Sequence, residues 1–279
     1  MNMAISKLKG DTVLTAPAIK SDAAIVSLSK VGMTYDSDEA VLSAIDLKIH
    51  EGEFFSLIGP SGCGKSTLLK IIAHITQPTS GKVNWWGSGA DVLGSKGKKI
   101  AFVFQDPTLM PWANVEENVR LPLELAGVPR NETKVQVVDA LQSVGLLDQA
   151  KRYPRHLSGG MKMRVSIARA LVTKPNLLLM DEPFGALDEF TRNKLDTDLS
   201  NLCRERRMTT VFVTHSIYEA AFLSNRVAVM ASAPGRIFKT FTIDAPSMRN
   251  ANFRLQNSFM EMCKTLSTAL VDASLGAER

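Results

Sequence analysis

The stretch Gly59-Pro60-Ser61-Gly62-Cys63-Gly64-Lys65-Ser66-Thr67 decides how this chain folds, because it matches the pattern G-x-x-x-x-G-K-[ST] in full. It follows the apolar run FFSLI at 54–58 and opens the helix-type pattern KSTLLKIIAHI. Glycines in such a turn let successive backbone N–H groups point at phosphate oxygens, and the following helix adds its positive end. We therefore expect residues 59–67 to bind a nucleoside triphosphate, with Lys65 reaching the β- and γ-phosphates and Ser66 ligating Mg²⁺.

Two carboxylates, Asp181 and Glu182, follow the apolar strand predicted at 177–180. Ligands of parallel sheets bind at the C-terminal ends of the strands. We expect Asp181 to hold the Mg²⁺ shell through water and Glu182 to orient and polarise the attacking water. The alternative for Glu182 is a helix-capping acid before Pro183.

Two further polar residues stand at predicted strand ends. His215 follows the strand at 210–213 and can donate a hydrogen bond to a γ-phosphate oxygen as charge develops there. Gln105 ends the strand at 100–104, can bond to the metal or to water, and begins a helical insertion. Gln105 is therefore a candidate link between the nucleotide and the insertion.

A second glycine-rich segment, Leu157-Ser158-Gly159-Gly160-Met161, opens another predicted helix. Ser158 and the two glycines expose a hydroxyl and backbone N–H groups, which predicts a second anion site. Two phosphate-binding surfaces on one chain are explained most simply by a head-to-tail homodimer. In such a pair, the Ser158 site of one copy closes over the nucleotide held by Lys65 of the other.

Strands and helices alternate around these motifs, which predicts an α/β fold with a largely parallel sheet covered on both faces. A further strand is predicted at 226–230, and the alternating stretches between 25 and 50 predict a hairpin interrupted by the acidic residues 36–39. The stretch 106–157 is predicted to be a helical insertion, since apolar residues recur there every third position, at Val135, Val138, Leu141 and Val144.

The composition is that of a folded, soluble-type protein. The 279 residues include 33 Lys and Arg against 28 Asp and Glu, a net charge of +5, with 45% hydrophobic and 22% charged residues. These values exclude disordered, collagen-like and coiled-coil classes. The apolar runs are too short for a spanning helix, and the N-terminus lacks a secretory signal core, so we expect a cytoplasmic location. The charge permits nucleic acid or anionic lipid as a partner but does not choose a function.

The three cysteines, Cys63, Cys203 and Cys263, fit neither a disulfide framework nor a zinc cluster. Cys63 occupies a variable position of the phosphate loop, where the backbone does the binding. We interpret it as passive, with a redox role or a site of alkylation as the alternatives.

The ordered set GPSGCGKST, Gln105, LSGG, LLLMDE, Ala186-Leu187-Asp188 and Thr214-His215 resembles the nucleotide-binding subunit of an ABC transporter over roughly residues 25–240. The resemblance implies a P-loop NTPase (RecA-like) core with an N-terminal antiparallel β-subdomain and an inserted helical subdomain. It also implies ATP and Mg²⁺ as cofactors, Ser66, Gln105 and Asp181 at the metal, and Lys65, Gln105, Glu182 and His215 as catalytic residues. Asp188 and the segment Ser158, Gly159, Gly160 would contact nucleotide, and Tyr35 would stack on adenine unless it is an ordinary strand aromatic.

Three longer stretches, FQDPTLMPWANVEENV, LSGGMKMRVSIARAL and VFVTHSIYEAAFLSNRVAVM, look closest to the nitrate, sulfonate and taurine branch of bacterial importers. Met161 is similar to what that branch uses, whereas Met163 and Ser216 depart from a frequent Gln and Asp. The resemblance implies a multi-span permease and a periplasmic solute-binding protein as partners, no nucleic acid, and a peripheral location at the cytoplasmic face of the bacterial inner membrane. The solute would be selected by those partners.

The predicted organisation is a leader at 1–24, an ABC ATPase domain at 25–245 with its helical subdomain at about 106–164, and a C-terminal helical extension at 246–279. The extension is too short for the regulatory barrel that some importer ATPases carry. We expect it to pack on the core through Phe253, Leu255, Phe259, Met262 and Leu266. Trp112 is interpreted as a permease contact or, alternatively, a core or groove-lining aromatic.

Two other functions stay open at this stage: a soluble ABC ATPase acting on ribosomes or DNA, and the ATPase subunit of an exporter. Soluble translation factors typically carry two nucleotide cassettes, and the DNA-repair type separates its two nucleotide motifs by a long coiled coil. Here 181 − 65 = 116 residues separate Lys65 from Asp181. Only the branch resemblance disfavours an exporter.

Overall fold

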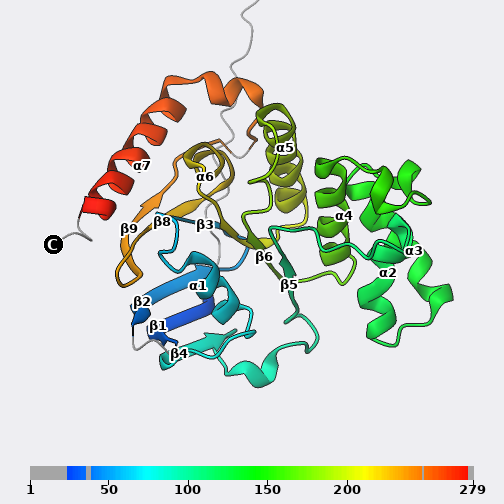
Figure 1. Cartoon of the computed structure of the whole chain (residues 1–279), viewed down its shortest axis with the longest axis horizontal. Coiled ribbons are helices and arrows are strands. Elements are labelled where there is room, and N and C mark those ends of the chain that lie inside the picture. Colours follow the sequence, from blue (N-terminus) through cyan, green and yellow to red (C-terminus); the bar gives the residue numbers. More distant parts are fainter. Residues whose placement is uncertain (1–23, 36–38, 247, 276–279) are drawn as a thin grey trace, which may run out of the picture.

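Short apolar runs form a six-stranded sheet at the centre of the molecule (Figure 1). The computed structural model describes residues 24–35, 39–246 and 248–275, so residues 1–23 of the predicted leader and residues 36–38 of the predicted acidic turn lie outside the described residues. The last residue of the predicted leader, Ala24, begins β1. The strand order is β5 (Ile100–Val103), β6 (Leu177–Asp181), β7 (Thr209–Val213), β3 (Phe54–Ile58), β8 (Arg226–Ala231) and β9 (Arg236–Thr242). The first five strands are parallel, which confirms the prediction, and β9 adds an antiparallel edge that the sequence pattern does not predict.

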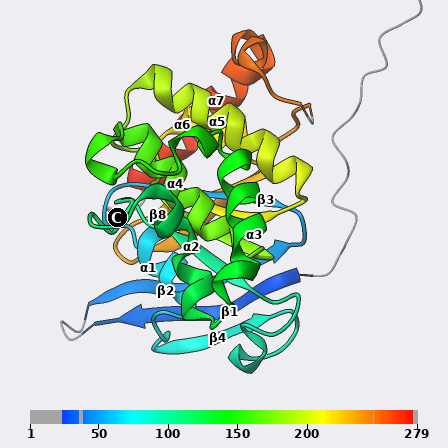
Figure 2. The same ribbon diagram turned by 90° about the vertical axis from the view of Figure 1, so that its right-hand side faces the viewer.

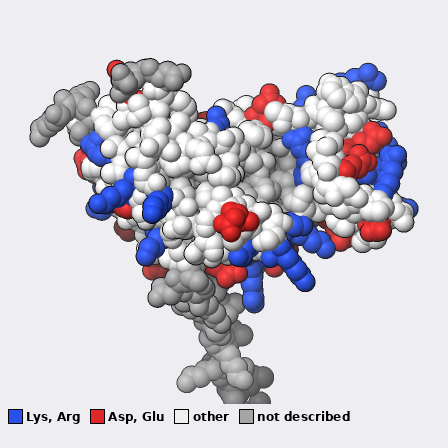
Figure 3. Space-filling view, turned by 90° about the horizontal axis from the view of Figure 1, so that it is seen from below, with Lys and Arg blue, Asp and Glu red and all other residues white. Residues whose placement is uncertain are grey.

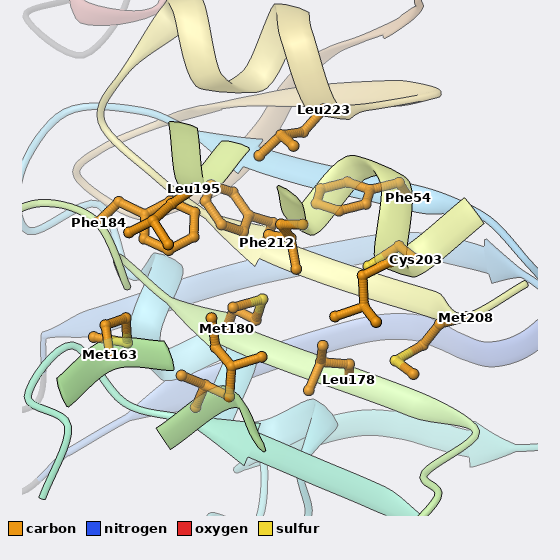
Figure 4. Packing of buried hydrophobic residues seen from close by; sticks show 14 of the residues in the cluster. Phe54, Met163, Leu178, Met180, Phe184, Leu195, Cys203, Met208, Phe212 and Leu223 are labelled. Carbon is orange, nitrogen blue, oxygen red and sulfur yellow. The ribbon is translucent and has the colours of Figure 1, made fainter. Parts of the chain in front are cut away.

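Alternate side chains of the central strands enter two separate buried clusters, one on each face of the sheet. Leu57 and Leu179 pack with α1 (Lys65–Ile72) and the N-terminal strands. Leu178 and Phe212 pack on the other face with Phe184, as Figure 4 shows. Because both faces are covered, β3 and β7 are buried along their whole length, and their sequences FFSLI and TTVFV are mostly apolar rather than alternating.

A second sheet of three antiparallel strands lies beside the central one, with the order β2 (Ala40–His50), β1 (Ala24–Thr34) and β4 (Ser80–Trp85). The β1–β2 pairing confirms the predicted hairpin. The strand β4 is not predicted, because its residues SGKVNW are mostly exposed and carry little apolar signal. This small sheet lies at the opposite end of the molecule from α5 (Glu189–Glu205) and α7 (Asn257–Leu275), as Figures 1 and 2 show.

The segment between β5 and β6 is helical, as predicted. It contains α2 (Val115–Leu125), α3 (Arg130–Ser143) and α4 (Gly159–Leu171), together with the 3-10 turns η2 (Leu147–Gln149) and η3 (Pro154–His156). A further 3-10 turn, η1 (Ala90–Val92), follows β4. The apolar spacing that predicts this helical segment does not mark the buried face of α3, since Val135 is 69% exposed. The buried residues of α3 follow the 3.6-residue period of a helix instead: Thr133, Val137, Ala140 and Leu141.

The chain ends in α6 (Ile217–Leu223), β8, β9, the 3-10 turn η4 (Ala251–Leu255) and α7. Phe253, Phe259 and Leu266 are buried against the core, and Met262 packs beside them, as predicted. The prediction for Leu255 is wrong, because its side chain is 81% exposed at the end of η4. The terminal segment therefore docks through its aromatic residues on the same face of the sheet as α5 and α6.

The surface carries both signs of charge. Figure 3 views the molecule from below relative to Figure 1, and on that face Lys and Arg lie among Asp and Glu with large uncharged areas between them. The net charge is therefore not gathered into a single basic patch on this face. Within the described residues, no helix combines the length and the apolar character needed to cross a bilayer.

Candidate functional site

The loop between β3 and α1 has the backbone shape of a phosphate cradle. Gly62 and Gly64 have φ values of 77° and 90°, in the left-handed region that favours glycine. A Cβ at Gly64 would lie 2.5 Å from Leu42 Cδ2, so β2 packs directly on the loop, whereas a Cβ at Gly62 would meet nothing within 4 Å. The loop is thus supported on one side by the small sheet and open at Gly62.

Lys65 begins α1 and is only 5% exposed. Its Nζ donates to the carbonyl oxygens of Gly59 and Pro60, both at 2.9 Å. Cys63 is 1% exposed, and burial raises the pKa of its thiol, against the lowering effect of the Lys65 charge. The predicted passive interpretation of Cys63 fits this environment, since a buried thiol with a raised pKa is a poor nucleophile.

Two of the three residues predicted to serve a metal, Ser66 and Asp181, lie together. Ser66 Oγ donates to Asp181 Oδ1 at 2.8 Å, bridging α1 and the end of β6. Burial raises the pKa of Asp181, and the negative charge of Glu182 adds to the rise, while the bond from Ser66 opposes it. Hydroxyl and carboxylate oxygens are the ligands that Mg²⁺ prefers, so this pair fits such an ion. No group of three His, Cys, Asp or Glu side chains suited to a metal occurs among the described residues.

Glu182 is held by its backbone. Its φ is 44°, in the left-handed region, and its N–H donates to the carbonyl oxygen of Val213 at 2.9 Å. Its Oε2 lies 3.4 Å from Nδ1 of His215, which is 55% exposed. The strand end of β6 and the strand end of β7 therefore bring these two predicted catalytic residues together. A left-handed φ in a residue other than glycine is uncommon and marks the position for attention.

Gln105 joins the same group. β5 ends at Val103, so Gln105 lies two residues beyond the strand rather than at its end. A Cβ built at Gly185 would lie 3.4 Å from His215 Cε1 and 3.9 Å from Gln105 Nε2. The absence of a side chain at Gly185 thus leaves room for His215 and Gln105 to approach the loop that carries Glu182.

A second group of predicted residues lies where α4 and α5 begin. Ser158 caps α4 by accepting from the N–H of Met161 at 3.3 Å, and Asp188 caps α5 by accepting from the N–H of Thr191 at 2.9 Å. These hydrogen bonds at the helix start lower the pKa of Asp188. A Cβ at Gly160 would lie 2.8 Å from Thr191 Cγ2, so the two helix starts touch through the glycine.

Ser158, Gly159 and Asp188 are exposed. Within the described ranges, no hydrogen bond or ion pair joins these three residues to the cradle at 59–67. Tyr35 follows β1 and is 47% exposed, and its stacking on adenine stays a prediction. Trp112 is 77% exposed, so the alternative of a core aromatic is wrong.

Sequence reasoning missed three residues behind the site: Arg192, Thr214 as a partner of Glu219, and Glu219 itself. Arg192 donates to the carbonyl oxygens of Phe184 and Leu187, and its Nε lies 3.4 Å from Glu219 Oε1. Thr214 Oγ1 donates to Glu219 Oε2. The only signal in the sequence is that all three stand within five residues of a predicted site residue, which is too weak to assign a contact.

A glycine cradle at a helix start, a buried lysine in it and two adjacent carboxylates at the end of β6 define a P-loop NTPase. The model of the family described as ABC transporter matches residues 42–185. The chain belongs to this family, in which it is an ATPase subunit.

Two curated relatives are transport ATP-binding proteins by name. The aliphatic sulfonates import ATP-binding protein SsuB of Bacillus licheniformis is 44% identical over 76% of this chain and 80% of its own length. The bicarbonate transport ATP-binding protein CmpC of Synechococcus elongatus is 46% identical over 75% of this chain, which spans only 31% of that longer protein.

Two solved structures of the bacterial ABC transporter cassette MJ0796 are also similar, each with 34% identity and a TM-score of 0.68, over 79% of this chain and 99% of theirs. Both are dimeric, and one is a post-hydrolysis state with ADP and inorganic phosphate. These likenesses confirm the predicted P-loop core.

Proposed function

We propose that this chain is the ATP-hydrolysing subunit of a bacterial importer, in which two copies close head to tail on ATP and drive a separate membrane permease. The observation that carries the proposal is the convergence of the predicted residues at one edge of the sheet. Ser66 meets Asp181 at 2.8 Å, and Glu182, the residue after Asp181, meets His215 at 3.4 Å. The residues proposed for binding and hydrolysis, at the start of α1 and the ends of β6 and β7, therefore lie close together, which supports a single site.

In this proposal, the backbone N–H groups of residues 61–66 bind the phosphates and Lys65 exchanges its two carbonyl partners for β- and γ-phosphate oxygens. Ser66, Asp181 and Gln105 would hold Mg²⁺. When bound, Mg²⁺ neutralises charge that develops on the transferred phosphoryl group. Tyr35 would contribute by stacking on the adenine.

Hydrolysis is assigned to Glu182 and His215. Glu182 would orient a water for in-line attack on the γ-phosphorus, so that the bond to the β–γ bridging oxygen breaks and ADP and phosphate leave. His215 would donate a hydrogen bond to a γ-phosphate oxygen as charge develops there. The backbone anchor of Glu182 to Val213 supports this role, because a carboxylate aimed by its main chain needs little reorganisation.

The head-to-tail pair is supported by the exposed face at the starts of α4 and α5. Ser158, Gly159 and Asp188 offer polar groups there, and the neighbouring Phe190 is 82% exposed. A second copy would cover this aromatic side chain and place Ser158 and Gly160 against the nucleotide of the first copy. The dimeric MJ0796 structures support the stoichiometry.

The importer class rests on the named relatives. SsuB and CmpC are named for the import of aliphatic sulfonates and the transport of bicarbonate, so we propose a small solute that carries an oxyanion group, such as a sulfonate, taurine, nitrate or bicarbonate. The partners would be a multi-span permease, contacted near Gln105 and Trp112, and a periplasmic solute-binding protein. The chain would lie at the cytoplasmic face of the membrane as a peripheral subunit.

The catalytic assignment is tested with Glu182→Gln. This variant should bind ATP, accumulate as a dimer and hydrolyse ATP at least about a hundredfold more slowly, because the group that orients water is lost. ATP turnover and the mass of the complex by light scattering measure both effects. Glu205→Gln, the same change at an exposed position of α5, is the matched control and should behave like the unaltered protein.

Lys65→Ala tests ATP binding rather than hydrolysis, since it should abolish ATP binding and, with it, the ATP-dependent dimer. Normal turnover in Glu182→Gln would assign the water-orienting role to another residue. Normal ATP affinity in Lys65→Ala would refute the cradle. The importer role is tested by uptake in a strain lacking the gene: retained uptake of all four solutes, or copurification with ribosomes rather than a permease, would contradict it.

A further inference from the structure

Four charged residues lie together behind the His215 turn, in a cleft of about 420 Å³ between α5, α6 and the C-terminal segment. They are Arg192 and Asp196 of α5, Glu219 of α6 and Arg254 of η4. Asp196 and Glu219 are 0% and 4% exposed. Buried carboxylates of this kind are costly unless they are paired, so the pairing within this group determines its arrangement.

Arg192 holds the loop that carries the catalytic carboxylate. Its Nη2 donates to the carbonyl oxygen of Leu187 at 2.7 Å and its Nε to that of Phe184 at 3.3 Å. The same Nε lies 3.4 Å from Glu219 Oε1. Arg192 therefore ties the loop between Glu182 and Asp188 to α6.

Glu219 holds the turn that carries His215. Its Oε2 accepts from Thr214 Oγ1, and Thr214 Oγ1 accepts from the N–H of Ser216 at 2.9 Å. Glu219 thus holds Thr214 directly and Ser216 through Thr214, and these are the residues on both sides of His215. Through Arg192 and Glu219, the loop of Glu182 and the turn of His215 share one anchor.

Arg254 brings the C-terminal segment into this anchor. Its Nη2 donates to Asp196 Oδ2 at 2.7 Å, and its guanidinium lies 3.8 Å from the ring centre of Phe222 on α6. Asp196 follows Arg192 by four residues, so both side chains lie on the same face of α5. The other oxygen of Asp196, Oδ1, is buried and has no hydrogen-bond partner. An Asp196 without Arg254 would compete with Glu219 and the loop carbonyls for Arg192.

We propose that Arg254 is a positioning residue for ATP hydrolysis, because it pairs with Asp196 and so leaves Arg192 to hold the Glu182 loop and the His215 turn. The C-terminal segment 248–275 thereby becomes part of the hydrolytic machinery without touching the nucleotide. Loss of its docking slows turnover and leaves ATP binding intact. This inference rests on the proposed roles of Glu182 and His215.

Steady-state ATP hydrolysis by the full chain with Arg254→Ala tests the proposal. We expect kcat to fall about tenfold, as for a displaced catalytic group, with KM for ATP changed less than about twofold. The double variant Arg254→Ala with Asp196→Asn should recover most of kcat, since the competitor for Arg192 is removed. Arg254→Lys, which restores a positive charge opposite Asp196, should also recover activity. Leu255→Ala, the next residue and 81% exposed, is the matched control with unchanged turnover.

An unchanged kcat in Arg254→Ala, or a loss of kcat that Asp196→Asn does not relieve, would overturn the proposal. If Arg254→Ala does not fold, Arg254→Gln carries the same test, because its amide keeps a donor near Asp196 without the charge. His215→Ala distinguishes a failure of the proposed catalytic site from a failure of the role proposed for Arg254. Full activity in His215→Ala would refute the proposed site, whereas an inactive His215→Ala beside a fully active Arg254→Ala would refute only the role of Arg254.

Discussion

Replacing Gly160 by alanine should show how closely the starts of α4 and α5 are fitted to each other. The added Cβ would lie 2.8 Å from Thr191 Cγ2 and 3.8 Å from Leu195 Cδ1. The first distance is well inside van der Waals contact and the second is ordinary contact. The methyl group of Thr191 is therefore the one neighbour with which the side chain of alanine would clash at position 160.

Two effects of opposite sign determine the stability of Gly160→Ala. Alanine is favoured over glycine within a helix by about 1 kcal/mol, whereas overpacking of a close contact costs about 1–3 kcal/mol. We expect a net loss of up to about 2 kcal/mol in the free energy of unfolding. Thr191→Ser removes the methyl group and keeps the backbone N–H that donates to Asp188. In that background the same change should stabilise the protein by about 1 kcal/mol.

Urea unfolding of the unaltered protein, Gly160→Ala, Thr191→Ser and the double variant measures the interaction between the two positions. The effect of Gly160→Ala should differ between the two backgrounds by about 1–3 kcal/mol, the size of the removed clash. The reasoning is refuted if alanine changes the free energy of unfolding equally in both backgrounds. It is also refuted if Gly160→Ala alone stabilises the protein, because the helix starts would then separate without cost.

Two other buried groups give predictions. Burial and the charge of Glu219 raise the pKa of Asp196 from 3.8 to about 7, so the folded state holds a proton that the unfolded state releases. The free energy of unfolding should therefore fall as pH rises from about 4 to about 7, and the fall should be about 4 kcal/mol larger than in the variant Asp196→Asn. Urea unfolding of both proteins across this pH range measures the difference. Urea midpoints that change in parallel for the two proteins would contradict the prediction. Cys63 is 1% exposed and burial raises the pKa of its thiol, so it should resist alkylation by iodoacetamide at pH 7.5 until the protein is unfolded in guanidinium. Mass spectrometry of digests measures the alkylated fraction, and rapid labelling of the native protein would count against the prediction.

The sequence predicted the parts of the molecule that depend on local patterns. Mostly apolar runs mark β3, β6 and β7 because both faces of these strands are covered. The residue types after those strands predicted that Ser66, Asp181, Glu182 and His215 would meet, since parallel strands end at one edge of the sheet. These predictions needed only strand order and residue type.

The missed features depend on partners distant in the sequence. β4 is mostly exposed and is stabilised by pairing with β1, so its own residues carry little signal. The three-residue spacing of Val135, Val138 and Leu141 indicates a helix but not its buried face, because such a spacing drifts around a helix with 3.6 residues per turn, and Val135 is exposed. The pair Arg254–Asp196 joins positions 58 residues apart, and no pattern near either residue indicates the other.

The two bonds from Lys65 to the carbonyl oxygens of Gly59 and Pro60 have a consequence for selectivity. A ligand that binds the Lys65 ammonium must replace both carbonyl oxygens. The free energy gained is therefore the difference between the new hydrogen bonds and the two that are lost. Ionised phosphate oxygens are stronger acceptors than neutral carbonyls, whereas a nucleoside or a monophosphate places no such oxygen at the lysine. In the proposed nucleotide site, the loop would therefore discriminate by the length of the phosphate chain, because a shorter ligand would not displace the protein's own carbonyl groups from Lys65.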